Sequence, residues 1–353
     1  MQKFNNSNAV SFTEWLRMSS DPLNSVAFTF ISRRNSTSAR YFPLLSHTKK
    51  TRIVAIYGSK LAKTDRISLL IFRLLKIAFK RRCKRYAWYH ETSPQDRLFS
   101  TNEILHLDDP TYSDKELSRL RMWEKGLKDK NLKAQIICTN SYTKDWLEKE
   151  LHYAQVVIIE QGFSRSELEL NKFKDFTCVY SSPYIHYTGD AHGEHTTWGC
   201  VTLFDEIIGP LNSTAPDIKF HLIGELGKEA KVKLSSFSNT YSHGLVSQST
   251  NQEIIERCHV GIYPRTFDHR RSMKKIFDYI GAGIPIVTFD LIDSEIVKKR
   301  DLGLVVNSST EFVEAVIALY KAKSLYNQIA KNTLNERGNF FWSVLAEKLE
   351  TLY

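Results

Sequence analysis

The chain has 353 residues, of which 42% are hydrophobic, 12% aromatic and 25% charged. This composition is typical of folded globular proteins and excludes a disordered chain, while the length exceeds what a single hydrophobic core usually fills. Uncharged apolar runs are shorter than the roughly 18 residues of a membrane-spanning helix, and the polar N-terminus lacks the apolar run of a secretory signal. Five scattered cysteines without a CxxC pair favour a reducing compartment. We therefore expect a cytoplasmic protein with two domains.

Formal charge is distributed unevenly along the chain, whose net charge is +10. Residues 1–170 contain 29 Lys and Arg against 18 Asp and Glu, a net charge of +11, whereas residues 171–353 contain 20 against 21, a net charge of −1. All the excess positive charge therefore lies in the first half. Such a surface favours a polyanionic partner, either nucleic acid, an anionic membrane surface or a phosphate-bearing substrate.

The first half of the chain alternates short apolar runs with segments of helical spacing. Strands are expected at residues 52–57, 85–89, 134–139 and 155–159, and helices at residues 66–84 and 143–151. This alternation is typical of a Rossmann-like domain.

The second half repeats the same alternation without interruption. Strands are expected at residues 176–181, 218–223, 243–246, 259–263, 284–289 and 303–306, with helices at 198–211, 228–237, 251–257, 272–282, 294–299 and 310–320. Strands alternating with helices imply βαβ crossovers and a parallel sheet that is covered on both faces.

The fold class predicted from these patterns is α/β, with two Rossmann-like domains that face each other across a cleft. The expected boundaries are 1–168 for the first domain and 169–338 for the second. Neither a GxGxxG nor a GxxxxGK[ST] motif occurs, so the main sequence evidence for a dehydrogenase or a P-loop enzyme is lacking.

The segment from Pro264 to Val287 carries the densest chemical signal. Ser272 is expected to cap a helix whose first turn presents unpaired N–H groups and the positive end of its dipole. Five cations crowd the same helix end, namely Arg265, Arg270, Arg271, Lys274 and Lys275. Cations clustered at a helix N-terminus favour a diphosphate ligand. Asp278, three residues after Lys275, is then placed to accept hydrogen bonds from ribose hydroxyls.

The run KIFDYIGAGIPIV at residues 275–287 resembles the donor-site signature of GT-B glycosyltransferases of the retaining, group 1-like kind. In that signature, a lysine and an acidic residue precede an A-G-x-P turn. Residues 219–224 look like the strand and glycine loop beside the nucleotide, with Gly224 as the glycine. Residues 339–353 are similar to the family's final helix, which crosses back onto the N-terminal domain.

The resemblance implies a hexosyltransferase-type enzyme that takes a sugar from a nucleoside-diphosphate sugar and transfers it to a saccharide or lipid-linked saccharide acceptor. The second domain would hold the donor and the first domain the acceptor. No cofactor and no obligatory metal are implied. The family's first acidic position is occupied here by Arg270, which is expected to stabilise the leaving diphosphate.

Two further catalytic candidates lie in the first half. Residues 86–91 resemble the strand that delivers a histidine to the site, so His90 is expected to hydrogen-bond the donor sugar or its leaving phosphate. Asp108 and Asp109 precede Pro110 in a turn, where a carboxylate would orient an acceptor hydroxyl, or act as general base if the reaction inverts the anomeric configuration.

The expected helix at residues 66–84 has a broad apolar face and a narrow basic stripe. The stripe is either the solvated edge of a sheet-covering helix or a surface that rests on anionic lipid headgroups. The second interpretation places the protein on the inner face of the plasma membrane, as a peripheral protein. The family resemblance implies cell-surface polysaccharide synthesis on a lipid carrier as its setting.

Two alternatives stay open. A sugar-nucleotide epimerase of the same fold would need no acceptor. A basic nucleic-acid-binding protein is suggested only by the charge of the first half, which has no recognisable recognition helix or aromatic-interleaved basic sheet. We therefore expect no nucleic-acid partner.

Overall fold

The computed structural model describes backbone and side chains for residues 104–107, 110, 112–163, 171–187, 200–267 and 273–352, and the backbone alone for strand residues 9–10, 26–33, 51–58, 85–88 and 103. The chain divides into two compact units. The first contains residues 1–162 together with 342–353, and the second contains residues 163–341. None of the helices within the described ranges has both the length and the apolar character that crossing a membrane requires.

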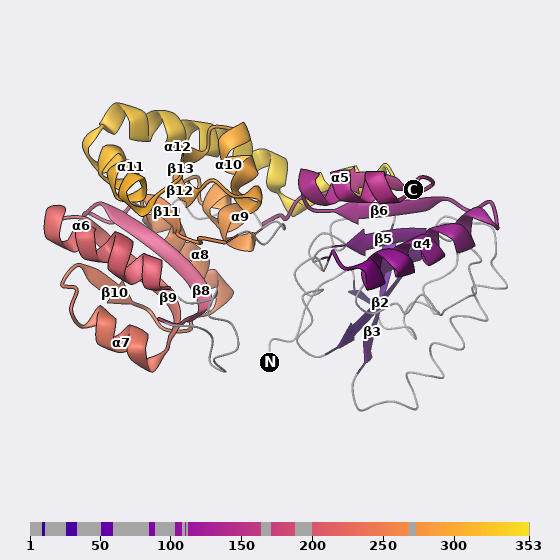
Figure 1. The fold of residues 1–353 in the computed structure, drawn as a ribbon, viewed down its shortest axis with the longest axis horizontal. Helices are drawn as coiled ribbons and strands as arrows, with labels where there is room; N and C mark the ends of the chain where they lie inside the picture. The colour runs from indigo at the N-terminus through magenta and orange to yellow at the C-terminus, as the bar shows by residue number, and fades with distance from the viewer. Residues whose placement is uncertain are drawn as a thin grey trace. The chain divides into compact units, whose positions relative to one another are not determined.

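The second unit is built on one six-stranded sheet in which every pairing is parallel (Figure 1). Its strands are β8 (Thr177–Ile185), β9 (Lys219–Leu226), β10 (Thr240–Ser242), β11 (Val260–Tyr263), β12 (Ile286–Phe289) and β13 (Gly303–Val306). Their spatial order is β10-β9-β8-β11-β12-β13. Counted from β8, this is the 3-2-1-4-5-6 order of the Rossmann fold, which reverses direction between β8 and β11.

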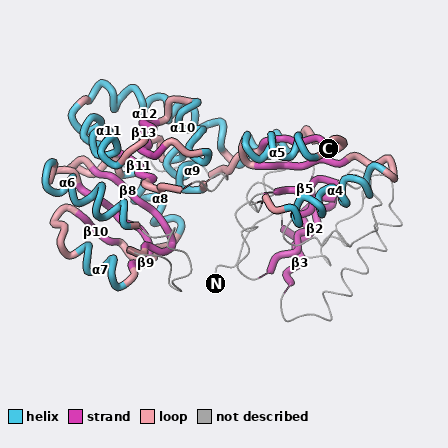
Figure 2. The backbone as a smooth tube through the Cα atoms, viewed as in Figure 1, coloured by secondary structure: helices cyan, strands magenta, loops and turns pink. Residues whose placement is uncertain are grey.

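Helices cover both faces of this sheet (Figure 2). They are the π-helix η3 (Thr202–Ile208), α6 (Gly209–Thr214), α7 (Lys228–Leu234), α8 (Gln248–Arg257), α9 (Lys274–Gly281), the 3-10 turn η4 (Ile292–Ser294), α10 (Glu295–Lys299), α11 (Ser309–Lys321), α12 (Lys323–Arg337) and the 3-10 turn η5 (Gly338–Phe340). Buried residues of η3, α7 and α11 form one apolar cluster with the sheet, and those of α8, α9 and α10 form another. Strands β8, β9, β11, β12 and β13 contribute residues to both clusters, as Tyr180 and Val179 of β8 do.

Tyr279 of α9 fills the place where β8 and β11 separate. The two strands pair only at Cys178–Val260 and Val179–Gly261. Beyond that point, the Tyr279 hydroxyl accepts a hydrogen bond from Ser181 N at 3.3 Å and donates one to Ile262 O at 3.2 Å. The phenol ring lies directly on Gly261, where an added Cβ would stand 2.3 Å from Tyr279 Cγ. This close approach holds α9 against the sheet.

The first unit contains two parallel sheets. Three strands pair in the order β1 (Ala9–Val10), β3 (Thr51–Gly58), β2 (Val26–Arg33), and four pair in the order β4 (Arg85–Trp88), β5 (Glu103–Leu107), β6 (Ala134–Cys138), β7 (Gln155–Ile158). Helices α4 (Asp114–Lys128) and α5 (Ser141–Glu150) follow β5 and β6. Helix α13 (Trp342–Glu350) also belongs to this unit, since Trp342 packs on Gly162 so closely that a Cβ there would lie 2.6 Å from the indole ring.

The expected α/β fold with parallel sheets is confirmed, and most predicted elements agree with the structure to within a few residues. The predicted strand at residues 243–246 is wrong, because the strand is Thr240–Ser242 and Gly244 adopts a φ of 65° that a strand does not allow. The predicted helix at residues 66–84 lies outside the described residues. Strands β1, β2 and β5 and helices α4 and α12 were not predicted from the sequence.

We predict that Gly261→Ala destabilises the second unit by about 1–3 kcal/mol, because the new methyl group forces the Tyr279 ring off β11. The measurement is the urea-unfolding midpoint at constant m-value. Gly338→Ala is the matched control, since an added Cβ at Gly338 meets nothing within 4 Å. Equal midpoints for the two variants would contradict the packing role of Gly261.

Candidate functional site

The N-terminal end of α9 lies at the point where the strand order reverses. The helix begins at Lys274, and Met273 occupies the N-cap position with φ −100° and ψ 118°. Met273 makes no side-chain cap bond. Ser272, the expected cap residue, lies outside the described residues. The N-terminus of a helix presents N–H groups and the positive end of its dipole, which suit an anion.

Lys274 and Asp278 form an ion pair one helical turn apart. Lys274 Nζ lies 2.6 Å from Asp278 Oδ1 and 2.9 Å from Oδ2. The Asp278 side chain is only 11% exposed, so this carboxylate is held in a fixed position. Its negative charge is already balanced by Lys274, which leaves it able to accept hydrogen bonds from neutral hydroxyl groups.

Lys275 has a different environment from its neighbour. Its ammonium group donates to Tyr180 Oη at 3.2 Å and lies 4.5 Å from the Tyr180 ring centroid and 5.9 Å from that of Tyr263. No ion pair within the described part of the chain includes Lys275. Burial, and then the nearby charge of Arg265, lower the pKa of Lys275 to about 7. An anion placed at this ammonium group would raise that pKa again.

Arg265 brings a second cation to the same place from the end of β11. Its guanidinium carbon lies 5.9 Å from the Tyr263 ring centroid and 4.8 Å from that of Phe267. Tyr263 is fixed beneath both cations, because its hydroxyl donates to the buried carboxylate of Asp293 at 2.9 Å. Burial, reinforced by the Asp293 charge, raises the pKa of Tyr263 well above its ordinary value, so the phenol stays neutral.

These groups make a compact anion-binding arrangement. Two cations rest on neutral tyrosine rings of β8 and β11, beside a helix N-terminus, at the carboxyl side of the point where the strand order reverses. Ligands of open α/β sheets bind at this position. The arrangement can neutralise a phosphate or diphosphate, while the Asp278 carboxylate lies one turn further along α9 to accept hydroxyl hydrogen bonds.

Gly224 has a structural role that differs from the expected nucleotide loop. It lies inside β9 with a φ of 144°, opposite a bulge in β8 between Ser181 and Tyr184. An added Cβ would stand 1.7 Å from Ser182 O. Only glycine allows β9 to pass the bulge, which redirects the end of β8 beside the site.

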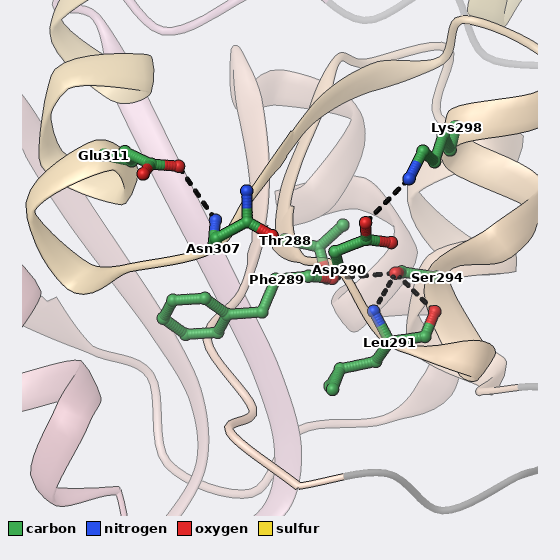
Figure 3. A network of polar contacts seen from close by, with 8 residues as sticks. All are labelled: Thr288, Phe289, Asp290, Leu291, Ser294, Lys298, Asn307 and Glu311. Carbon is green, nitrogen blue, oxygen red and sulfur yellow. Dashed lines mark hydrogen bonds and ion pairs between the residues drawn. The ribbon is translucent and has the colours of Figure 1, made fainter.

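The loops that follow β12 and β13 are fixed by their own contacts (Figure 3). Ser294 Oγ accepts from Leu291 N at 3.0 Å and lies 2.7 Å from Phe289 O, and Lys298 pairs with Asp290 at 2.6 Å. Asn307 N donates to the Glu311 carboxylate at 2.9 Å. These contacts hold η4, and with it Asp293, in place beneath Tyr263.

Six of the predicted site residues lie outside the described residues, namely His90, Asp108, Asp109, Arg270, Arg271 and Ser272. The structure brings together Arg265, Lys274, Lys275 and Asp278. The roles of Tyr180, Tyr263 and Asp293 were not predicted from the sequence. The two tyrosines could have been found as the aromatic residues of the strands that flank the reversal of strand order, β8 and β11. Over the described ranges, no group of three or more His, Cys, Asp or Glu side chains is arranged to hold a metal ion.

Comparisons with known proteins give matches by structure alone. No protein-family model matches the sequence, and no curated protein matches it in sequence. The structure of HepE from Anabaena in complex with UDP is similar, with a TM-score of 0.64 at 12% identity over 93% of this chain and 99% of that one. WaaG, a glycosyltransferase involved in lipopolysaccharide biosynthesis, has a TM-score of 0.55 at 10% identity over 93% and 99%.

TarM from S. aureus, in a mutant complex with fondaparinux, alpha-GlcNAc-glycerol and UDP, has a TM-score of 0.57 at 10% identity. The match covers 81% of this chain but 58% of TarM, so the chain spans little more than half of that protein. These neighbours are GT-B proteins. The chain therefore has the GT-B fold, as the sequence resemblance implied.

Proposed function

We propose that the protein is a glycosyltransferase that moves a sugar, of the hexosyl class, from a nucleoside-diphosphate sugar to a saccharide or lipid-linked saccharide. The observation that carries this proposal is the pair of cations, Lys275 and Arg265, beside the N-terminus of α9 where the strand order reverses. The GT-B fold supports it, as do the UDP complexes of HepE and TarM.

Each described residue has a specific role in this proposal. In the transfer, the anomeric carbon bonds to an acceptor oxygen while its bond to the diphosphate breaks, and negative charge develops on the leaving group. Lys275 and Arg265 neutralise that charge, with the α9 N–H groups as further donors. Asp278, held by Lys274, accepts hydrogen bonds from the ribose hydroxyls. The chain's own cations take the place of an obligatory metal.

The remaining candidates complete the site as proposals. Arg270, Arg271 and Ser272 immediately precede α9 in sequence and would extend its cationic end. His90 would face the donor sugar, and Asp108 or Asp109 would orient the acceptor hydroxyl. Ser272 would add its hydroxyl and N–H groups to the donors around the diphosphate.

We further propose that the protein works in the cytoplasm, peripheral to an anionic membrane, in cell-surface polysaccharide synthesis. Helix α4 supports the membrane location. Its exposed side carries Met122, which is 61% exposed, and basic side chains around it. The exposed basic residues of α4 and the turn after it are Lys115, Arg119, Arg121, Lys125, Lys128, Lys130 and Lys133. The exposed acidic residues there are Asp114 and Asp129, so the surface is strongly basic. A basic surface around an apolar side chain suits lipid headgroups.

We predict that UDP raises the melting temperature of the protein and that Asp278→Asn weakens UDP binding about tenfold, because one charge-assisted ribose contact is lost. The measurements are thermal shift and calorimetric titration. Glu295→Gln in α10 is the matched control, since it also removes the carboxylate of an i,i+4 ion pair, with Lys299 at 2.6 Å, and should bind UDP as the wild type does. Equal UDP affinity of the two variants would contradict the role of Asp278.

A single nucleotide-sugar assay separates the alternatives. A glycosyltransferase releases the nucleoside diphosphate when an acceptor is added, whereas an epimerase changes the sugar and releases none. Absence of any UDP-dependent shift, combined with tight salt-sensitive binding of DNA or RNA, would overturn the proposed function.

We predict opposite effects of Lys275→Met on stability and on UDP binding. Below pH 7 the folded protein holds Lys275 charged in a desolvated place, so the methionine variant is more stable by about 1–2 kcal/mol. Above pH 7 the folded state releases this proton while the unfolded state keeps it up to about pH 10.5, so wild-type stability rises and the difference shrinks. Melting curves of both proteins from pH 6 to pH 10 measure this difference in stability.

UDP affinity of the wild type should fall as pH rises above about 7, and Lys275→Met should lower it at least about tenfold. The matched control is Lys231→Met, on the exposed side of α7, which should change neither the stability of the protein nor its affinity for UDP. A Lys275→Met variant that binds UDP normally would contradict the phosphate role.

We predict that the protein sediments with vesicles containing about one third phosphatidylserine, and that the triple variant Lys115→Glu, Arg119→Glu, Lys125→Glu loses at least about tenfold in partition coefficient, since each cation contributes about 1 kcal/mol. The control replaces Lys228, Lys231 and Lys321, exposed in the second unit, by Glu. Equal vesicle binding by the two triple variants would refute a membrane role for α4, and so would wild-type binding that is as strong to neutral vesicles as to phosphatidylserine vesicles.

A further inference from the structure

Three aromatic side chains gather where β5 and β6 of the first unit end. Tyr112 precedes α4, which follows β5, while Tyr142 and Trp146 lie in the first turns of α5, which follows β6. β5 and β6 pair in parallel, so both connections leave the same, carboxyl edge of the sheet. This is the edge at which open α/β sheets bind their ligands. We call these three residues the aromatic platform.

Tyr112 is held in a backbone conformation that bulky residues rarely adopt, with a φ of 53°. Several contacts impose this conformation. Tyr112 N donates to Glu116 Oε2 at 2.9 Å, and the Tyr112 hydroxyl lies 2.7 Å from Thr143 Oγ1, whose residue is buried. Backbone strain of this kind persists where the surroundings fix it and is concentrated at functional sites. The strain here sets the position of one ring of the platform.

The rings of the platform meet edge to face. The Tyr112 ring lies 5.5 Å from Tyr142 at an interplanar angle of 71°, and 5.1 Å from Trp146 at 67°. All three side chains are half-buried, so each keeps part of its surface accessible. The ring planes therefore form corners rather than a parallel slot. A puckered sugar chain presents apolar C–H faces at varied angles, which match ring surfaces that meet at a corner.

Polar groups surround the platform. Ser113 and Asn140, the N-cap residues of α4 and α5, lie next to Tyr112 and just before Tyr142. The Ser113 and Asn140 side chains accept from Glu116 N and Thr143 N, which fixes their positions. Binding sites combine aromatic surface with a few fixed polar groups, and a saccharide offers the matching combination of C–H faces and hydroxyl edges.

We propose that the aromatic platform of Tyr112, Tyr142 and Trp146 is a saccharide-binding site. Resting on the proposed function, it is the surface on which the acceptor sugar stacks. The C–H face of one sugar ring packs on Trp146 and that of a neighbouring ring on Tyr142, while Tyr112 fixes the angle between these two surfaces. The acceptor is then recognised as an oligosaccharide of at least two units, in the first unit of the protein and apart from the phosphate-binding cations.

The experiment is binding of the full chain to an array of natural oligosaccharides, followed by titration of the glycan that it binds best. The wild type is expected to bind glycans, and Tyr142→Ala and Trp146→Leu are each expected to weaken binding at least about tenfold. Tyr112→Phe, which keeps the ring and removes the bond to Thr143, is expected to weaken binding less. All variants should keep the wild-type affinity for UDP, which binds in the second unit. Folding of the first unit is checked separately, by circular dichroism and by a urea-unfolding midpoint close to that of the wild type.

The matched control is Tyr241→Ala, which removes a tyrosine that is 49% exposed on β10 of the second unit. No glycan bound by the wild type, or equal glycan affinity of the platform and control variants, overturns the proposal. The two proposals fail separately. Normal UDP binding with undiminished glycan affinity in the variants refutes the platform alone, whereas platform-dependent glycan binding without any UDP binding refutes the glycosyltransferase and leaves a saccharide-binding site.

Discussion

The two hydrogen bonds of the Tyr279 hydroxyl are the interaction on which the candidate site depends. β8 and β11 must separate for a ligand to approach the sheet between them, and separation leaves backbone groups of both strands without ladder partners. Tyr279 satisfies Ser181 N and Ile262 O with one atom and packs its ring on Gly261. The same helix carries Lys274, Lys275 and Asp278. Tyr279 therefore also fixes the position of these side chains relative to the sheet.

The adjacent lysines of α9 show how position on a helix divides chemical roles. Lys274 is neutralised by Asp278 and holds that carboxylate in place. Lys275, rotated by about 100°, points onto two tyrosine rings and has a pKa of about 7. A desolvated ammonium group is unfavourable in the empty protein and favourable beside a diphosphate. Stability is thereby exchanged for binding, as is common at functional sites.

The two units place chemically different groups at the carboxyl edges of their sheets. In the second unit these are cations on neutral phenols beside a helix N-terminus, which suit a phosphate. In the first unit they are aromatic rings among hydroxyl and amide groups, which suit a neutral sugar. This division is what the proposed transfer requires, since it brings together an anionic donor and a hydroxyl-bearing acceptor.

The sequence by itself determined the α/β class, the parallel sheets and the grouping of Arg265, Lys274, Lys275 and Asp278, because strand and helix periodicity and helical spacing are local properties. It did not determine that Lys274 rather than Lys275 pairs with Asp278, since both spacings fit one helix face. It also did not reveal the roles of Tyr279, Asp293 and the strained Tyr112, or that Gly224 lies inside β9 against a bulge. Those roles depend on which backbone groups and rings meet across the sheet, and only tertiary packing decides such contacts.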